Sequence, residues 1–196
     1  IIVTSEGNVV RGQKRLFSEW VLHRAVYDSR PEVDAVFHSH APYATALGAS
    51  GQRLPHPFLP EAVVSLGPEV PSVPLSMPGP EAVEALTSVL GRGQTCLIEG
   101  NGLLSWGTDL EQAFLRMELV EHLAKVAHHA HIYGGVRRLE TRMVEVLTAK
   151  HVKANLAAPD VAATGHQHYV AQLKNRVESE LQDGALPMSA DELASV

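Results

Sequence analysis

The stretch AVFHSHA at residues 35–41 begins with three apolar residues, which are followed by His38-Ser39-His40. Its apolar start predicts a short buried strand. Side chains two residues apart on a strand share one face, about 6.6 Å apart along the chain, so the imidazoles of His38 and His40 can converge on one cation. Imidazole suits metals such as zinc or iron. The alternative is a pair of histidines at the mouth of a sheet that make ordinary hydrogen bonds, and these residues alone leave both interpretations open.

A helical spacing of apolar residues precedes this strand over residues 15–29 and ends before Pro31. Glu19, near the start of the helix, could supply a carboxylate to the same site, as a ligand or as a general acid and base. The alternative is structural: Ser18 caps the helix, and Glu19 favours the positive N-terminal end. His23 lies one turn beyond Glu19 and is expected to be a packed histidine rather than a ligand.

The rest of the chain alternates between helical and strand-like patterns. One strand is expected at residues 62–65, inside a proline-rich stretch. Another is expected at residues 95–99, and a Gly100-Asn101-Gly102 turn joins it to a third at residues 103–106. The alternation of helices and strands favours an α/β or α+β sandwich. Helices are expected at residues 41–47, 80–90, 109–133, 139–156 and 169–181.

Composition excludes several classes of function. The chain has 196 residues, with 16 Lys and Arg against 22 Asp and Glu, and a formal net charge of -6. This balance makes nucleic acid and anionic membranes unfavourable partners. No apolar run approaches the ~20 residues of a membrane span, and the single cysteine, Cys96, forbids an internal disulfide. A cytoplasmic location is therefore expected. The chain does not begin with Met, and we expect an N-terminal segment to be missing before Ile1.

Four motifs, in this order and at about this spacing, resemble the class II aldolase/adducin family. The similarity covers roughly residues 1–140, and the combination of motifs is specific. The motifs are Ser18-Glu19-Trp20-x-x-His23, Tyr27-x-x-Arg30-Pro31, Ala35-Val36-x-His38-x-His40-Ala41 and Gly-x-Gly-Leu-Leu-x-x-Gly at residues 100–107.

The resemblance implies an α/β fold, a single three-layer domain with a central, mostly antiparallel sheet flanked by helices. It implies that this domain spans residues 1–140, before a C-terminal helical extension at residues 141–196. It also implies a homotetramer with sites between subunits and a small-molecule substrate. In the enzymes of the family a divalent metal, usually zinc, is held by the histidines that match His38 and His40 and by a third histidine. The carboxylate that matches Glu19 handles protons at the metal.

At the third-histidine position this chain has Asn101. Asparagine is a poor zinc ligand. The site could therefore hold metal weakly, use a carboxylate or water instead, prefer a harder metal such as iron or manganese, or hold none. Asn101 is thus either a third ligand or a pocket residue. The resemblance places the phosphate loops of the family before Ile1.

Two further histidine clusters are candidates for other roles. The segment at residues 166–168, His-Gln-His, could supply a replacement ligand from the C-terminal extension. The second cluster is interpreted as structural, with Glu121 and His128 forming a polar pair at a packed or subunit interface. It comprises His128, His129 and His131.

Three functions are therefore expected, from different classes. The leading one is a metal-dependent lyase of the aldolase or decarboxylase type, which acts next to a carbonyl of a small hydroxy- or keto-compound through a metal-stabilised enediolate. The second is a non-haem iron oxygenase of aldolase-like fold, acting on a prenylated hydroxyphenylpyruvate or mandelate in antibiotic biosynthesis. The third is an adducin-like interaction module without catalytic activity, for which Asn101 is the best indication.

Overall fold

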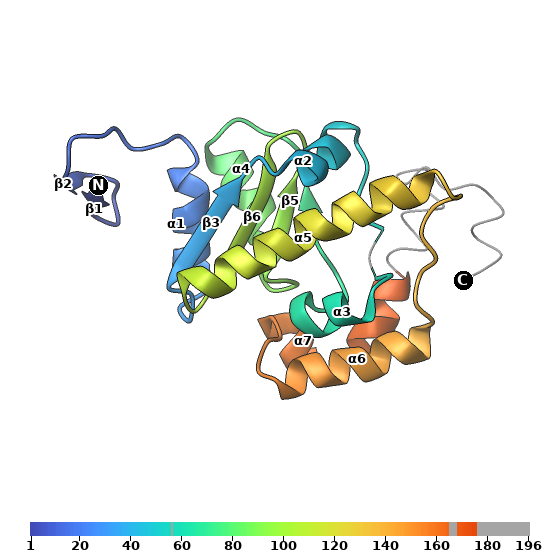
Figure 1. The fold of residues 1–196 in the computed structure, drawn as a ribbon. Helices are drawn as coiled ribbons and strands as arrows, with labels where there is room; N and C mark the ends of the chain where they lie inside the picture. Colours follow the sequence, from blue (N-terminus) through green and yellow to red (C-terminus); the bar gives the residue numbers. More distant parts are fainter. Residues whose placement is uncertain (56, 165–167, 176–196) are drawn as a thin grey trace.

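The computed structural model describes residues 1–55, 57–164 and 168–175. Its centre is a sheet of four strands, β3 (Ala35–Ser39), β4 (Ser72–Val73), β5 (Thr95–Ile98) and β6 (Gly102–Gly107). They lie in the order β3-β6-β5-β4. The strands β3, β6 and β5 are labelled in Figure 1. Neighbours are antiparallel except β4 and β5, which run parallel. The expected central, mostly antiparallel sheet is confirmed.

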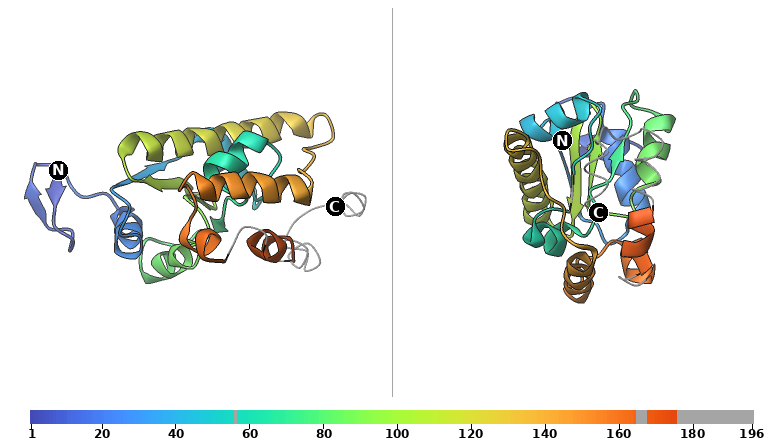
Figure 2. Two further views of the ribbon diagram at one scale, coloured as in Figure 1. Left: turned by 90° about the horizontal axis from the view of Figure 1, so that it is seen from below. Right: turned by 90° about the vertical axis from the view of Figure 1, so that its right-hand side faces the viewer.

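Helices cover both faces of the sheet (Figure 2). The helices α1 (Trp20–Ser29) and α4 (Pro80–Thr87) pack against one face, and α2 (Pro42–Ala49) and α5 (Leu110–His131) pack against the other. Each face has its own cluster of buried apolar side chains, which accounts for the three layers. The cluster under α1 and α4 includes Leu22, Leu86, Ile98 and Trp106, and the cluster under α2 and α5 includes Ala44, Leu97, Met117 and Val120.

Strand alternation decides on which face the histidines lie. On β6, Leu104 belongs to the α1/α4 cluster and Leu103 to the α2/α5 cluster, because successive side chains of a strand point to opposite faces. On β3, Val36 likewise packs under α1 and α4, whereas Phe37 packs on the other side. The same alternation places His38 on the face covered by α1 and α4.

The longest helix begins where the sequence predicts. Asp109 is the N-cap of α5, and its side-chain oxygen accepts a hydrogen bond from the backbone N–H of Gln112 at 2.7 Å. Beyond the end of α5, Gly134 and Gly135 both have φ of 96°, a left-handed conformation that stops a helix.

Residues 62–65 are helical, so the strand expected there is wrong. They belong to α3 (Pro60–Leu66), in which Pro60 occupies the first turn, where proline favours a helix. The helix α3 packs against α6 (Thr141–Lys153) in an apolar cluster that includes Val63. The β-branched valines favoured a strand locally, and packing of the helix overrides that preference.

Three short elements complete the described chain. The strands β1 (Ile2–Val3) and β2 (Val9–Arg11) form a separate antiparallel pair. The helix α7 (Pro159–Thr164) follows α6, and residues 168–175 are helical. Within the described parts of the chain, no helix has the length and apolar character needed to cross a membrane.

Candidate functional site

The two histidines of the 35–41 stretch lie together at the end of β3. Their ring centroids are 5.3 Å apart and the rings meet edge to face. His38 is half-buried, and His40, which directly follows the strand, is exposed. The prediction that both imidazoles share one face is confirmed, and they lie at the edge of the α1/α4 layer, where solvent can reach them.

The tip of the β5–β6 turn contacts both imidazoles through one residue, Asn101. The Nε2 atom of His38 lies 2.9 Å from the backbone oxygen of Asn101, and Nε2 of His40 lies 3.1 Å from its side-chain Oδ1. A carbonyl oxygen only accepts hydrogen bonds, so each ring donates its Nε2–H here. The structure therefore brings three of the four predicted site residues into direct contact.

Glycines on either side of Asn101 allow this close approach. Gly100 and Gly102 have φ of 69° and 86°, which glycine adopts without strain. A side chain at Gly102 would clash with the carbonyl oxygen of Ser39, at the end of β3. The backbone N–H of Asn101 donates to the carbonyl of Ile98 at 3.0 Å and closes the turn. The turn is thus held firmly against the histidine pair.

Glu19 lies at the start of α1, beside the two imidazoles. The hydroxyl of Ser18 donates to Glu19 Oε2 at 2.6 Å. This hydrogen bond, more than any other interaction, lowers the pKa of Glu19, and the nearby His38 and His40 lower it further. Glu19 occupies the N-cap position and α1 has no side-chain cap, so the alternative in which Ser18 caps the helix is wrong. Glu19 is an ionised carboxylate next to the histidine pair.

His23 is a third imidazole of this region. Burial lowers its pKa to about 4, and both His38 and Glu19 are close enough to influence it electrostatically. Its ring packs edge to face on Phe17, with centroids 4.9 Å apart. Its Nε2 atom is enclosed, with no hydrogen-bond partner among the described residues. His23 is therefore packed, as expected, and its ring is neutral. Its position one helical turn beyond Glu19 could have indicated that it lies near the site.

The chemical types of the side chains at this site are those that bind divalent metals. Two imidazole nitrogens meet an amide oxygen, with the Glu19 carboxylate close by, and imidazole and carboxylate together bind zinc or iron. Within residues 1–55, 57–164 and 168–175, no three His, Cys, Asp or Glu side chains are arranged so that they could hold a metal ion. The side chain that contacts His40 at this point is the amide of Asn101.

The other histidine clusters do not join this site in the described chain. His128 and His129 are on α5, on the opposite side of the sheet, where both rings stack near Tyr43. The expected pairing of Glu121 with His128 is replaced by another contact: Glu121 accepts the backbone N–H groups of Tyr43 and Ala44 at 2.9 and 2.8 Å. The structural interpretation of Glu121 holds, because its carboxylate caps the start of α2.

The C-terminal His-Gln-His segment falls only partly within the described chain. Residues 166 and 167 lie outside the described residues. His168 is exposed, and its Nε2 lies 3.0 Å from the amide nitrogen of Gln172 on the same helical segment. Cys96 is fully buried, which raises the pKa of its thiol to about 12 and makes it inert as a nucleophile.

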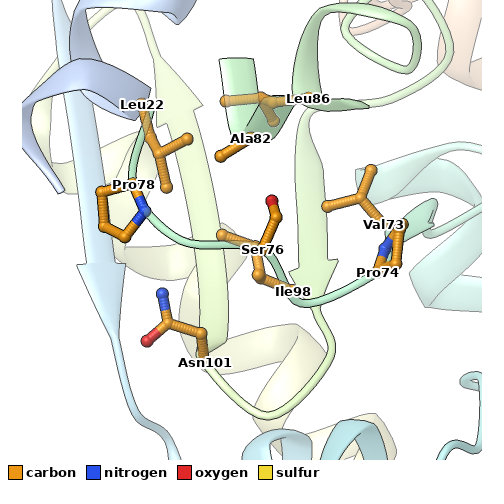
Figure 3. A pocket seen from close by; sticks show the side chains of 9 residues that line it. All are labelled: Leu22, Val73, Pro74, Ser76, Pro78, Ala82, Leu86, Ile98 and Asn101. Atoms are coloured by element: carbon orange, nitrogen blue, oxygen red, sulfur yellow. The ribbon is translucent and has the colours of Figure 1, made fainter. Parts of the chain in front are cut away.

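A small pocket lies on the face of the sheet that α1 and α4 cover, and Asn101 is part of its lining (Figure 3). Asn101 is at one end of it, and the proline-containing segment that follows β4 forms one wall. None of its described lining residues is charged. Its lining comprises Leu22, Val73, Pro74, Ser76, Pro78, Ala82, Leu86, Ile98 and Asn101.

Comparison with known proteins identifies relatives of this chain. Over 152 residues the chain is 26% identical to the 5-deoxy-D-ribulose 1-phosphate aldolase of Bacillus thuringiensis, covering 76% of this chain and 70% of the relative. Over 130 residues it is 32% identical to the 3-oxo-tetronate 4-phosphate decarboxylase of Haemophilus influenzae, covering 64% of this chain and 61% of the relative. The chain thus spans less than two thirds of the length of the decarboxylase.

A solved structure shows the same fold. An L-fuculose 1-phosphate aldolase superimposes with a TM-score of 0.68 and 27% sequence identity, over 76% of this chain and 69% of the other. Residues 1–128 match the family model described as the Class II Aldolase and Adducin N-terminal domain. This match covers the sheet, the histidine pair and Glu19. The chain belongs to the class II aldolase and adducin family.

Proposed function

We propose that the protein is a metal-dependent lyase of the aldolase or decarboxylase type, which breaks a bond next to the carbonyl of a small hydroxy- or keto-compound. The observation that carries this proposal is the meeting of His38, His40 and Asn101 beside an ionised Glu19. The names of the relatives, aldolases and a decarboxylase, support the same class of reaction.

The histidine pair is the proposed metal site. His38 and His40 would hold the ion, zinc in the first instance and iron or manganese as alternatives. A bound divalent ion supplies a Lewis acid that stabilises negative charge developing on a carbonyl oxygen of the substrate.

Glu19 is the proposed proton carrier. Its hydrogen bond from Ser18 fixes Oε2 and keeps the carboxylate ionised near neutral pH, which is the form that accepts a proton. The same group, once protonated, can return the proton to the carbon from which the leaving fragment departs. Placement at the N-terminus of α1 also favours the negative charge.

The pocket beside Asn101 is too small for a substrate. Its volume is about 10 Å³, which is room for about one water molecule. Apolar side chains from α1, α4 and β5 form most of its wall, and Ser76 and Asn101 are its polar residues. We therefore propose that the substrate approaches the histidine pair from the side on which His40 is exposed.

Assembly and location are part of the proposal. We propose a homotetramer in the cytoplasm, with no nucleic-acid or membrane partner. Three large apolar side chains near the start of α5 are exposed and support burial against another subunit: Leu110, Phe114 and Leu115.

A second candidate function rests on the donor set. Two histidines and one carboxylate are the ligand types of non-haem iron oxygenases. His38, His40 and Glu19 are of these types, and Asn101 stands in place of a third histidine. Iron as the resident metal would therefore favour an oxygenase, whereas zinc or manganese would favour the lyase.

Metal analysis tests the proposed site. Wild-type protein, the His38→Ala/His40→Ala double variant and a His168→Ala control are purified side by side, and their metal content is measured by inductively coupled plasma mass spectrometry. We expect near-stoichiometric divalent metal in the wild type and in the control, and its loss in the double variant. Equal metal content in all three proteins would refute the histidine pair as the metal site.

A further inference from the structure

We propose that a second pocket, between the β1–β2 pair and α1, binds a small aliphatic amine through its ammonium group. This pocket shares no lining residue with the small pocket that Asn101 lines, and the proposal does not depend on the metal site. Its lining comprises Glu6, Trp20, Val21, Arg24, Ala25, Asp28 and Val83.

Size and position are the first argument. The pocket has a volume of about 260 Å³. Pockets for drug-sized ligands have about 300–1,000 Å³, so this one suits a smaller molecule. The β1–β2 pair lies outside the three layers, on the side of α1 (Figure 1). Its turn is packed against the start of α1, because a Cβ atom at Gly7 would lie only 3.2 Å from side-chain atoms of Leu16 and Trp20.

The charges of the lining are the second argument. Glu6 and Asp28 are acidic and Arg24 is basic, so two carboxylates share one guanidinium in this lining. Arg24 Nε donates to Asp28 Oδ2 at 3.1 Å in an ion pair. The hydrogen bond from Ser5 is the main cause that lowers the pKa of Glu6 to about 2, and Arg24 lowers it further, so Glu6 is ionised at neutral pH. A cation in the pocket would balance the remaining negative charge.

The uncharged part of the lining is the third argument. Val21 and Ala25 of α1 and Val83 of α4 provide apolar surface, and Trp20 adds an indole ring. The face of an indole attracts an ammonium ion, and apolar side chains favour contact with an alkyl chain. An aliphatic amine has both parts. An inorganic cation lacks the alkyl chain, and an alcohol lacks the charge.

Isothermal titration calorimetry with butylammonium chloride tests the proposal, and 1-butanol is the uncharged probe of the same chain length. We expect the wild type to bind the amine at least about tenfold more tightly than the alcohol, because hydrogen bonds between charged groups are the stronger ones. Glu6→Gln and Asp28→Asn keep the size of the side chain and should each weaken amine binding by about tenfold. Glu111→Gln, at an exposed position of α5 on the other side of the sheet, is the matched control and should bind like the wild type.

Tryptophan fluorescence locates the bound amine. The chain has two tryptophans, Trp20 in the pocket and Trp106, which is fully buried. The amine should therefore change the emission of the wild type through Trp20. Trp20→Phe keeps an aromatic ring for the ammonium group and should abolish the change in emission.

Several outcomes would overturn the proposal, and none of them bears on the metal content of the histidine pair. These are no amine binding by the wild type, equal affinities for the amine and 1-butanol, and undiminished amine binding in Glu6→Gln and Asp28→Asn. A change in emission that persists in Trp20→Phe would place the amine elsewhere and overturn it too. Thermal unfolding verifies that each variant is folded. If Trp20→Phe is not, the variants of the exposed residues Glu6 and Asp28 still provide the test.

Discussion

The carboxylate of Glu19 illustrates how much of the site depends on single residues. Ser18 and Glu19 are adjacent in sequence, so their hydrogen bond is local and could be anticipated as an alternative to helix capping. The contacts of Asn101 with His38 and His40 span more than 60 residues of chain. Such contacts follow from the pairing of β3 with β6, which no local pattern specifies, and the role of Asn101 was therefore open from the sequence alone.

Replacement of Glu19 by Gln tests the proton carrier. Gln keeps the size of the side chain but cannot accept a proton, so we expect turnover to fall by about 100-fold or more. Metal content should stay within a factor of two of the wild type if the carboxylate carries protons and is not a required ligand. The measurement is kcat together with metal content of the same preparation. Full activity in Glu19→Gln would contradict the assignment.

His151 provides a test of stability against pH. It is 1% exposed, its Nδ1–H donates to the carbonyl of Val64 at 2.8 Å, and burial lowers its pKa below the usual 6.5. As the pH falls below 6.5, the unfolded chain takes up a proton at this residue more readily than the folded chain. The free energy of unfolding should therefore decrease, with a slope of at most about 1.4 kcal/mol per pH unit from this group.

The comparison is between slopes measured by chemical denaturation at pH 5 to 8. His151→Gln should show a smaller dependence on pH than the wild type, whereas His129→Gln, at an exposed position of α5, should leave the slope unchanged. Identical slopes in wild type and His151→Gln would show that His151 is not responsible.

At the scale of elements, the start of α2 shows a helix capped by a neighbour. Ala41 is the N-cap residue and has no side-chain acceptor, so the first N–H groups of α2 need another partner. Glu121 of α5 supplies it, by accepting from Tyr43 and Ala44. Since α2 begins just after His40, this contact also fixes the chain that leaves the histidine pair.

Glu121→Ala should remove the cap. We expect the free energy of unfolding to fall by about 1–2 kcal/mol, because two backbone donors lose a charged acceptor. Glu118→Ala, an exposed carboxylate on the same helix, is the matched control and should change stability by less than about 0.5 kcal/mol. Urea denaturation measures both, and equal effects of the two changes would contradict the capping role.

Elements with strong local signals are those that the sequence predicts well. The strand with the His-x-His pair and the long helix that begins near residue 109 were both predicted, because their apolar patterns are encoded within a few residues. The strand expected at residues 62–65 was wrong, since its apolar residues fit a short buried strand and a buried helix equally well. Only the packing of α3 on α6 distinguishes the two.

At the scale of the molecule, the fold brings one face of the sheet, the start of α1 and the β5–β6 turn to a single point. The buried side chains between this face and the helices α1 and α4 hold the sheet in place. Gly102, which has no side chain, allows the turn that carries Asn101 to lie close to the end of β3. The three-layer arrangement was predictable from the family resemblance, whereas helix boundaries such as the start of α1 at Trp20 depended on the packed structure.

The central claim is that the protein is a metal-dependent lyase, and one assay tests it most directly. Small hydroxy- and keto-compounds, with and without phosphate, are incubated with metal-loaded protein, and the release of aldehyde, ketone or carbon dioxide is measured. We predict that at least one compound is cleaved, that chelation of the metal abolishes cleavage, and that added metal restores it. Undiminished cleavage by protein verified to be free of metal, or no cleavage of any compound by fully loaded protein, would contradict the claim.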